Sequence, residues 1–209
     1  MTDREKRPVF EPLKWALYLM SLAYSVGIAA RAVLYRYGIF KTDNVPMKVV
    51  SVGNLTLGGT GKTPFVMMLA RIVKHEIGRE AAVLIRGYGW DEQAMLKANL
   101  GEIPVMVGED RVKSCRKAIR LYGSDTAILD DGFQYWELAR DLNIVLVDSR
   151  NPFGNGFLFP RGILREPEES IRRADIVVFT KTNKKLSDIP ALKDYLVKIN
   201  GRLIFLEAV

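Results

Sequence analysis

The segment GNLTLGGTGKTPF, residues 53–65, carries residue types that bind phosphate groups. Its glycines let backbone N–H groups curl around phosphate oxygens, Lys62 is spaced to reach the β- and γ-phosphates of a nucleotide, and Thr63 can ligate Mg²⁺. The common form of such a loop, G-x-x-x-x-G-K-[ST], has its first glycine where this chain has Thr56. We expect nucleotide contacts from Thr56, Leu57, Gly58, Gly59, Thr60, Gly61, Lys62 and Thr63.

The segments on either side of this loop have the patterns of a strand and of a helix. Upstream, VPMKVVSVG is apolar and β-branched, as a buried strand is. Downstream, apolar residues recur at helical spacing until Gly78, namely Phe65, Met68, Leu69, Ile72 and Val73. A phosphate-binding loop requires this strand–loop–helix context. A glycine-rich turn before an ordinary helix is the alternative, but the G-K-T triplet favours a nucleotide site.

A second strand ends in two carboxylates. The short apolar run from Ala127 to Leu129 leads into Asp130 and Asp131. Carboxylates at the C-terminal end of a strand face the crevice where an open α/β sheet binds its ligands. Asp-Asp-Gly is also common turn chemistry, which is the structural alternative. Together with the nucleotide loop, the pattern predicts a metal site made of Thr63, Asp130 and Asp131.

Strand and helix patterns alternate along the chain. Helices are expected at about 11–37, 61–77, 91–99, 110–122 and 187–199, and strands at 47–52, 81–86, 104–108, 125–130, 143–148, 174–180 and 203–207. This alternation predicts an α/β fold with a P-loop NTPase-like, mostly parallel sheet flanked by helices. The loop 149–167 is too long for a simple connection, and its Phe, Leu and Pro content argues against disorder.

Composition narrows the class of protein. The chain has 209 residues, enough for one domain of this kind, and its single Cys115 excludes a disulfide scaffold. No Cys/His cluster is present, and the only histidine, His75, is expected on the surface. The net charge of +7 indicates an acidic partner. No aromatic–basic repeat favours nucleic acid, so anionic lipid or a phosphorylated substrate is preferred, while the oligomeric state stays open.

An uncharged apolar stretch, Trp15 to Ala30, lies near the N-terminus. It is shorter than the roughly 20 residues that span a bilayer. Three interpretations compete: a signal peptide, a buried core helix, and an interfacial helix in the membrane surface. An exported nucleotide enzyme would lack ATP, which disfavours the first. We prefer the interfacial helix, with aromatic rings at headgroup depth from Trp15, Tyr18, Tyr24 and Tyr35.

A series of unusual motifs runs along the chain in order: SVGNLTLGGTGKTPF, IRGYG, GEDR, LDDGFQ, ARDLNIVLVD, PFGNGFLFPRGILREP and RRADIVVFTKTN. Together they closely resemble the tetraacyldisaccharide 4′-kinase (lipid A 4′-kinase) family. The resemblance extends from the N-terminal apolar helix to about Asn183. The loop of that family has Ser or Thr in place of the first glycine, which accounts for Thr56.

The resemblance implies transfer of the γ-phosphate of ATP, with Mg²⁺, to the 4′-hydroxyl of a tetraacyldisaccharide 1-phosphate, a lipid A precursor. It implies a location at the cytoplasmic face of the inner membrane of a Gram-negative bacterium. The chain would divide into a membrane-associating helix at 1–40 and a P-loop kinase domain at 41–209. Lys62 and Asp131 would then be catalytic.

Further site residues come from the resemblance alone. The catalytic aspartate of the family lies at the start of a helix in a G-D-E-P stretch, whose counterpart here is WDEQ, so Asp91 is the implied base. The alternative for Asp91 is a helix N-cap. The positions implied to lie near phosphates and the lipid headgroup are Arg86, Arg111, Gln134, Arg165 and Glu166.

Two departures from the family pattern leave a second function open. The family continues D-D-G-F-Q-H where this chain has Tyr135, whose ordinary pKa of about 10 prevents it from acting as a base at neutral pH. Family members also have a second lobe that contributes a histidine, and His75 does not match it. The first hypothesis is an active or fragmentary kinase. The alternatives are a membrane-associated nucleotide-binding protein with impaired or no kinase activity, and a nucleic-acid-dependent ATPase.

Overall fold

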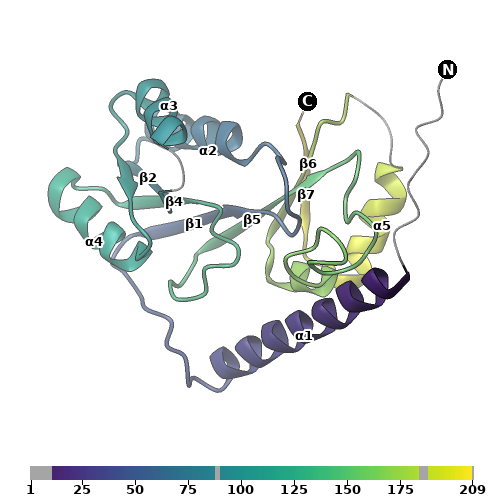
Figure 1. The fold of residues 1–209 in the computed structure, drawn as a ribbon. Helices are drawn as coiled ribbons and strands as arrows, with labels where there is room; N and C mark the ends of the chain where they lie inside the picture. The colour runs from purple at the N-terminus through teal and green to yellow at the C-terminus, as the bar shows by residue number, and fades with distance from the viewer. Residues whose placement is uncertain (1–10, 88–89, 184–187, 209) are drawn as a thin grey trace.

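The protein, described by a computed structural model, has one parallel sheet between layers of helices (Figure 1). The structure describes residues 11–87, 90–183 and 188–208, and for residues 90–92 the backbone only. The described strands lie in the order β3-β2-β4-β1-β5-β6-β7, and every neighbouring pair is parallel. Their bounds are β1 Lys48–Gly53, β2 Ala81–Ile85, β3 Val105–Val107, β4 Thr126–Asp130, β5 Leu142–Asp148, β6 Ile176–Thr180 and β7 Ile204–Glu207.

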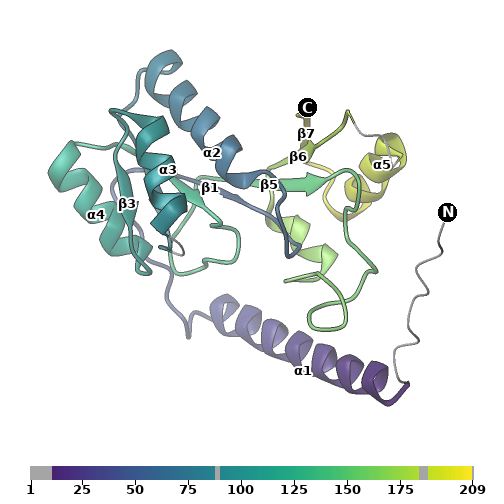
Figure 2. The same cartoon turned by 45° about the horizontal axis from the view of Figure 1, so that its top comes forward.

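The helices cover both faces of this sheet, as the expected α/β class requires (Figures 1 and 2). They are α1 Glu11–Arg36, α2 Lys62–Arg71, α3 Trp90–Leu100, α4 Arg111–Tyr122 and α5 Ile189–Ile199, with short turns η1 Ile72–Glu76 and η2 Glu168–Arg173. α2 and α3 pack on one face, and α4 and α5 pack on the other. Strand residues alternate between these faces: Ile144 and Leu146 join the α2 layer, whereas Val145 and Val147 face the α5 layer.

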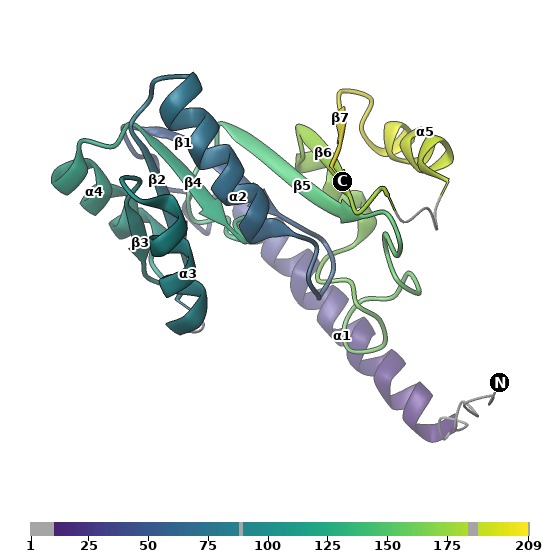
Figure 3. The same cartoon turned by 90° about the horizontal axis from the view of Figure 1, so that it is seen from above.

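The helix after the glycine-rich loop differs in detail from its expected pattern. Val66, Ala70 and Val73 are the residues it buries, whereas Met68 is 47% exposed. The reason is that α2 lies across the sheet with α3 beside it, so its buried stripe follows small residues that allow close packing (Figure 3). The helix also widens into a π-helical turn over η1, where His75 is exposed as expected.

The N-terminal helix α1 lies along the edge of the domain and is not a core helix (Figure 1). Ser21 is the buried residue of α1, so the interpretation as a buried core helix is wrong. Among the described residues, α1 is the one helix long and apolar enough to cross a membrane, with a mean hydropathy of 1.6. Its outer face exposes large apolar side chains, including Leu13, Trp15, Leu19 and Val26.

The long loop 149–167 is ordered and makes contacts with both α1 and the glycine-rich loop. The Ser21 hydroxyl donates to the Leu158 carbonyl at 2.9 Å, and the Tyr24 hydroxyl donates to the Arg165 carbonyl at 3.0 Å. Leu164 is only 2% exposed and belongs to the core beneath α5. The apolar content that argued against disorder is therefore what anchors this loop.

Candidate active site

The glycine-rich loop has the backbone conformation of a phosphate cradle. It follows β1 and leads directly into α2, whose first residue is Lys62. Gly58 and Gly61 have φ angles of +118° and +84°, which side chains other than glycine rarely adopt. A Cβ at either position would meet open space, so the loop is open on the side where the helix N-terminus can receive an anion.

Thr56 occupies an extended position where a glycine has no advantage. It pairs with Leu164 in an antiparallel β-bridge, and the Leu57 N–H donates to the Ile163 carbonyl at 2.6 Å. On the other side, the Arg165 N–H donates to the Leu55 carbonyl at 2.7 Å. β-branched residues suit such a paired segment. The long loop thus forms a short ribbon with the beginning of the phosphate loop, and this pairing explains the threonine.

Asn54 orients Lys62, a role that sequence reasoning did not assign. It is fully buried, its Oδ1 accepts from Lys62 Nζ at 3.0 Å, and its Nδ2 donates to the Thr56 carbonyl at 2.7 Å. The Gln134 side chain donates to the Asn54 carbonyl at 3.0 Å. Asn54 therefore ties the lysine to the start of its own loop. A polar residue directly after a buried strand was the available signal.

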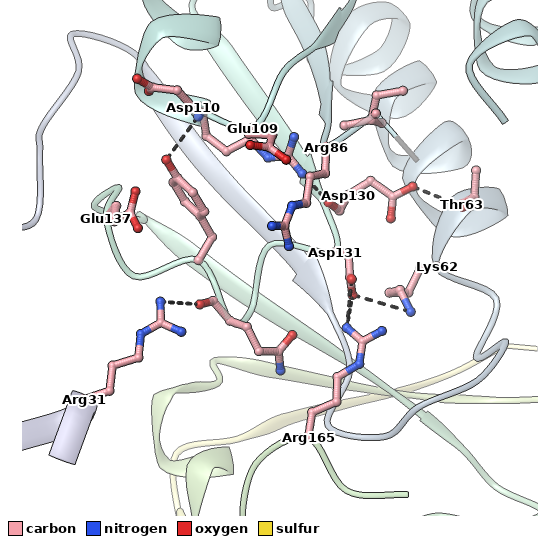
Figure 4. Close-up of a pocket in the computed structure, with 15 residues that line it drawn as sticks. Arg31, Lys62, Thr63, Arg86, Glu109, Asp110, Asp130, Asp131, Glu137 and Arg165 are labelled. Atoms are coloured by element: carbon pink, nitrogen blue, oxygen red, sulfur yellow. Dashed lines mark hydrogen bonds and ion pairs between the residues drawn. The ribbon is translucent and has the colours of Figure 1, made fainter. Parts of the chain in front are cut away.

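Asp130 and Thr63 meet because β4 lies next to β1, the strand that leads through the glycine-rich loop into α2. β4 pairs with β1 so that Asp130 lies opposite Val52, one residue before Gly53 begins the turn toward the loop. As a result, the Thr63 hydroxyl donates to Asp130 Oδ2 at 3.1 Å (Figure 4). A hydroxyl and a carboxylate oxygen side by side are hard oxygen ligands of the kind that Mg²⁺ prefers. These residues fit a magnesium ion.

The Asp131 carboxylate forms ion pairs with two cations. Arg165 Nη1 donates to its Oδ1 and Oδ2 at 2.9 and 2.8 Å, and Lys62 Nζ lies 3.6 Å from Oδ1. The backbone of Asp131 is left-handed, with φ of +56°, which turns its side chain away from the direction of Asp130. Burial opposes its ionisation, but Lys62 and Arg165 outweigh burial and lower the pKa of Asp131. Asp131 is thus held as a carboxylate between the two cations.

These side chains line one cavity of about 750 Å³ (Figure 4). The sequence-predicted residues in its wall are Lys62, Thr63, Arg86, Arg111, Asp130, Asp131, Gln134 and Arg165. Residues 56–61 are not part of this wall. Arg31 of α1 also lines the cavity and donates to the Gln134 carbonyl at 3.1 Å. The cavity volume is typical of a site for a small ligand.

Arg111 is a buried cation in the wall of this cavity. It is 3% exposed and donates to the carbonyls of Gly108 and Asp130 at 2.7 and 3.3 Å. Burial, together with the nearby Arg86, lowers its pKa, although Tyr135 and Asp130 counteract this. The Tyr135 hydroxyl accepts from the Arg111 N–H at 3.1 Å. Burial also raises the pKa of Tyr135 to about 12, so its phenol is no base at neutral pH.

Glu166, an expected substrate contact, is not in the wall of this cavity. Glu166 is 4% exposed and forms an ion pair with Arg173, so any effect on a substrate would pass through that arginine. Asp91 lies in the first turn of α3, but its side chain is outside the described part of the chain. Its role as a base or as an N-cap remains a prediction.

The ends of β5 and β6 also hold the glycine-rich loop, which sequence reasoning missed. Lys181 Nζ donates to the Gly59 carbonyl at 2.5 Å and to Asp148 Oδ2 at 2.7 Å. The Thr180 hydroxyl donates to the Thr60 carbonyl at 3.0 Å. The contacts of Thr180 and Lys181 with the glycine-rich loop join residues about 120 positions apart, so no local pattern could have found them.

Comparison with known proteins gives one consistent result. The family model for tetraacyldisaccharide-1-P 4′-kinase matches residues 13–91 and 89–204. The tetraacyldisaccharide 4′-kinase of Syntrophus aciditrophicus is 45% identical over 193 residues, which is 81% of this chain and 51% of that protein. That of Desulfatibacillum aliphaticivorans is 42% identical over 191 residues, covering 80% of this chain and 52% of that protein. The chain therefore spans about half the length of these curated relatives.

Solved structures agree with this result. The crystal structure of LpxK from Aquifex aeolicus in complex with ATP is similar with a TM-score of 0.76 and 35% identity, over 84% of this chain and 61% of that one. The hydrogenase maturation factor HypB from Archaeoglobus fulgidus, at 14% identity and a TM-score of 0.54, shows the same P-loop NTPase-like fold. By the family model and the Aquifex structure together, the chain belongs to the tetraacyldisaccharide-1-P 4′-kinase family.

Proposed function

We propose that this chain is the nucleotide-binding part of a kinase that transfers the γ-phosphate of ATP to the 4′-hydroxyl of a tetraacyldisaccharide 1-phosphate. The observation that carries the proposal is the convergence of Lys62 and Arg165 on Asp131 beside the Thr63–Asp130 pair. Phosphoryl transfer depends mainly on positioning and on charge stabilisation, and these residues supply both. The relative whose structure contains ATP supports the choice of nucleotide.

The cavity and the glycine-rich loop beside it would each have a role in this reaction. Backbone N–H groups of residues 56–61 and the start of α2 would bind the β-phosphate, while Lys62 would neutralise charge on the γ-phosphate. Thr63 and Asp130 would hold Mg²⁺, which supplies charge neutralisation and alignment of the triphosphate. When a triphosphate enters, its oxygens would compete with Asp131 for Lys62 and Arg165. Arginine suits this exchange because its planar fork binds phosphate with two hydrogen bonds.

The acceptor hydroxyl would enter from the side of Arg86 and Gln134. Its oxygen forms a bond to the γ-phosphorus, the bond to the bridging β–γ oxygen breaks, and ADP leaves. We assign orientation of the hydroxyl, and receipt of its proton, to Asp91 at the start of α3. Arg86 and Arg111 at this end of the cavity would stabilise the transferred phosphoryl group.

The helix α1 would bring the site to the lipid. Its exposed apolar face suits insertion into a membrane surface, and its inner face is fixed to the domain through Ser21, Tyr24 and Arg31. Because these contacts extend over several helical turns, α1 is better placed to lie alongside the membrane than to cross it. We infer a position at the cytoplasmic face of the inner membrane, where both ATP and the lipid A precursor are accessible.

The test is ³²P transfer from ATP to tetraacyldisaccharide 1-phosphate in detergent micelles. Asp91→Ala is expected to lower kcat about 10²-fold or more with little change in the apparent affinity for ATP, since the contact would be made mainly in the transition state. The matched control is Asp188→Ala, which removes the N-cap of a helix outside the cavity. Robust transfer that Asp91→Ala leaves unchanged would remove Asp91 from the mechanism.

A nucleotide-binding protein with little or no kinase activity is the second candidate. The described residues place no histidine at the cavity, and the raised pKa of Tyr135 excludes it as a substitute base. This candidate predicts stabilisation by Mg·ATP without phosphate transfer to the acceptor. The same ³²P assay, run beside a thermal shift measurement, separates the two functions.

A further inference from the structure

A second cluster of charged side chains lies on the far side of segment 134–137 from the nucleotide cavity. The guanidinium of Arg173 lies between the rings of Phe133 and Trp136, 4.3 Å from each ring centre, and pairs with Glu166. Arg140 donates from Nη1 to the Phe133 carbonyl at 3.1 Å. We call Arg31, Arg140, Arg173 and Glu166 the arginine cluster.

The arginine cluster has more positive than negative charge. Three guanidinium groups, from Arg31, Arg140 and Arg173, act on one another, and Glu166 is the carboxylate that acts on all three. Burial, followed by the repulsion from Arg173, lowers the pKa of Arg140 to about 10. Partly buried charges are normally balanced by partners of opposite sign, because removing them from water is costly. One carboxylate for three guanidiniums leaves this cluster short of negative charge.

A cavity of about 270 Å³ opens onto this cluster. Arg140, Arg173, Trp136 and Asn143 line it, together with Tyr35 from the C-terminal end of α1. Within the described chain, two polar atoms of these residues are buried without a hydrogen-bond partner: Trp136 Nε1, a donor, and Asn143 Oδ1, an acceptor. Such unsatisfied groups are uncommon and indicate a missing partner. A phosphate ester with neighbouring hydroxyl groups offers both an acceptor and a donor.

We propose that this cavity binds the phosphate group of a lipid at the membrane surface, between the guanidinium groups of Arg140 and Arg173. Segment 134–137 separates it from the nucleotide cavity, and Arg31 contacts both sides through Gln134 and Trp136. A sugar phosphate lying across this segment could place its hydroxyl in one cavity and its phosphate in the other. The phosphate has two sources, the 1-phosphate of the acceptor or an anionic phospholipid headgroup, and the first rests on the proposed function.

The first experiment needs no enzymatic activity. The indole N–H signal of Trp136, assigned with Trp136→Phe, is followed by NMR in detergent micelles while glucose 1-phosphate is added. We expect a saturable shift that glucose does not cause and that persists in Lys62→Ala, where the nucleotide site is impaired. Arg140→Gln should weaken the apparent affinity about 10-fold or more, because it removes a charge-assisted contact.

Two variants make this result specific. Arg172→Gln changes an exposed arginine adjacent to Arg173 and should leave the titration unaltered. Arg140→Lys keeps the charge but loses the fork, so it should give an intermediate affinity even if Arg140→Gln folds poorly. No shift of the Trp136 signal in the unmodified protein, or equal effects of Arg140→Gln and Arg172→Gln, would overturn the proposal.

The second experiment distinguishes the sources of the phosphate. If the acceptor supplies it, Arg140→Gln raises the KM for tetraacyldisaccharide 1-phosphate about 10-fold without changing the KM for the acceptor that lacks the 1-phosphate, or for ATP. If a phospholipid supplies it, Arg140→Gln leaves all three KM values unchanged. The variant instead loses the preference of the unmodified protein for phosphatidylcholine vesicles that contain phosphatidylglycerol over vesicles of phosphatidylcholine alone. A chain that transfers no phosphate at all refutes the proposed function, whereas the NMR titration still decides this site.

Discussion

Asn54→Ala should destabilise both the fold and the nucleotide site. The substitution removes the acceptor of the Lys62 ammonium at 3.0 Å and the donor to the Thr56 carbonyl at 2.7 Å. Asn54 is fully buried and the Lys62 side chain is 14% exposed, so water replaces these contacts poorly. A hydrogen bond to a charged group contributes about 1.5–3 kcal/mol and a neutral one about 1 kcal/mol. The expected loss in the free energy of unfolding is therefore about 2–4 kcal/mol.

Urea unfolding followed by circular dichroism measures this loss. For a chain of this size each kcal/mol of stability shifts Tm by roughly 2–4 °C, so the Tm of the variant should be lower by about 5–15 °C. The midpoint in urea should fall with an unchanged slope, because the surface exposed on unfolding stays the same. Binding of Mg·ADP should also weaken, since Lys62 loses its fixed position.

Asn99→Ala is the matched control for this prediction. Asn99 is exposed, and its side chain donates from Nδ2 to the Met95 carbonyl at 2.8 Å within α3, while its backbone carbonyl accepts from Arg71 and would be kept in the variant. Its replacement should change the free energy of unfolding by no more than about 0.5 kcal/mol. If Asn54→Ala unfolds at the same urea concentration as Asn99→Ala, the role assigned to Asn54 is refuted.

Three further predictions follow from the same structure. Lys62→Ala should keep the fold but lose the thermal stabilisation that Mg·ATP provides, and undiminished stabilisation would contradict the assigned site. The pKa of Asp131 is lowered from its usual 3.8, so its contribution to stability is present above that pH and is lost as the pH falls through the native pKa. The free energies of unfolding of Asp131→Asn and the unmodified protein should therefore differ at pH 7 and converge in acid. A difference that stays constant with pH would count against the ion pairs. Replacing Trp15, Leu19 and Val26 together by serine should release the protein from vesicles in high salt without lowering Tm, whereas membrane binding that survives would assign attachment to another surface.

The elements of the fold and the centre of the site could be read from local patterns. A buried parallel strand needs a continuous apolar run, and a helix that covers a sheet needs an apolar stripe, so both patterns can be recognised in the sequence. Likewise Lys62, Thr63 and Asp130 lie at the ends of their own helix or strand, where spacing along the chain fixes their place. The expected helices and strands in the described residues accordingly appear within a few positions of their predicted bounds.

The partners of these residues depended on contacts between distant segments. Asn54 reaches Lys62 because the chain turns back after β1, and Arg165 reaches Asp131 because the long loop pairs with residues 55–57. The same loop fixes which side of α1 faces the domain, which the helical pattern left open. The family resemblance implied that Glu166 is a substrate contact, and only the tertiary structure shows that its side chain is buried against Arg173. Sequence spacing specifies which face of an element a residue lies on, but the path of the loops and the register of the strands decide what that face meets.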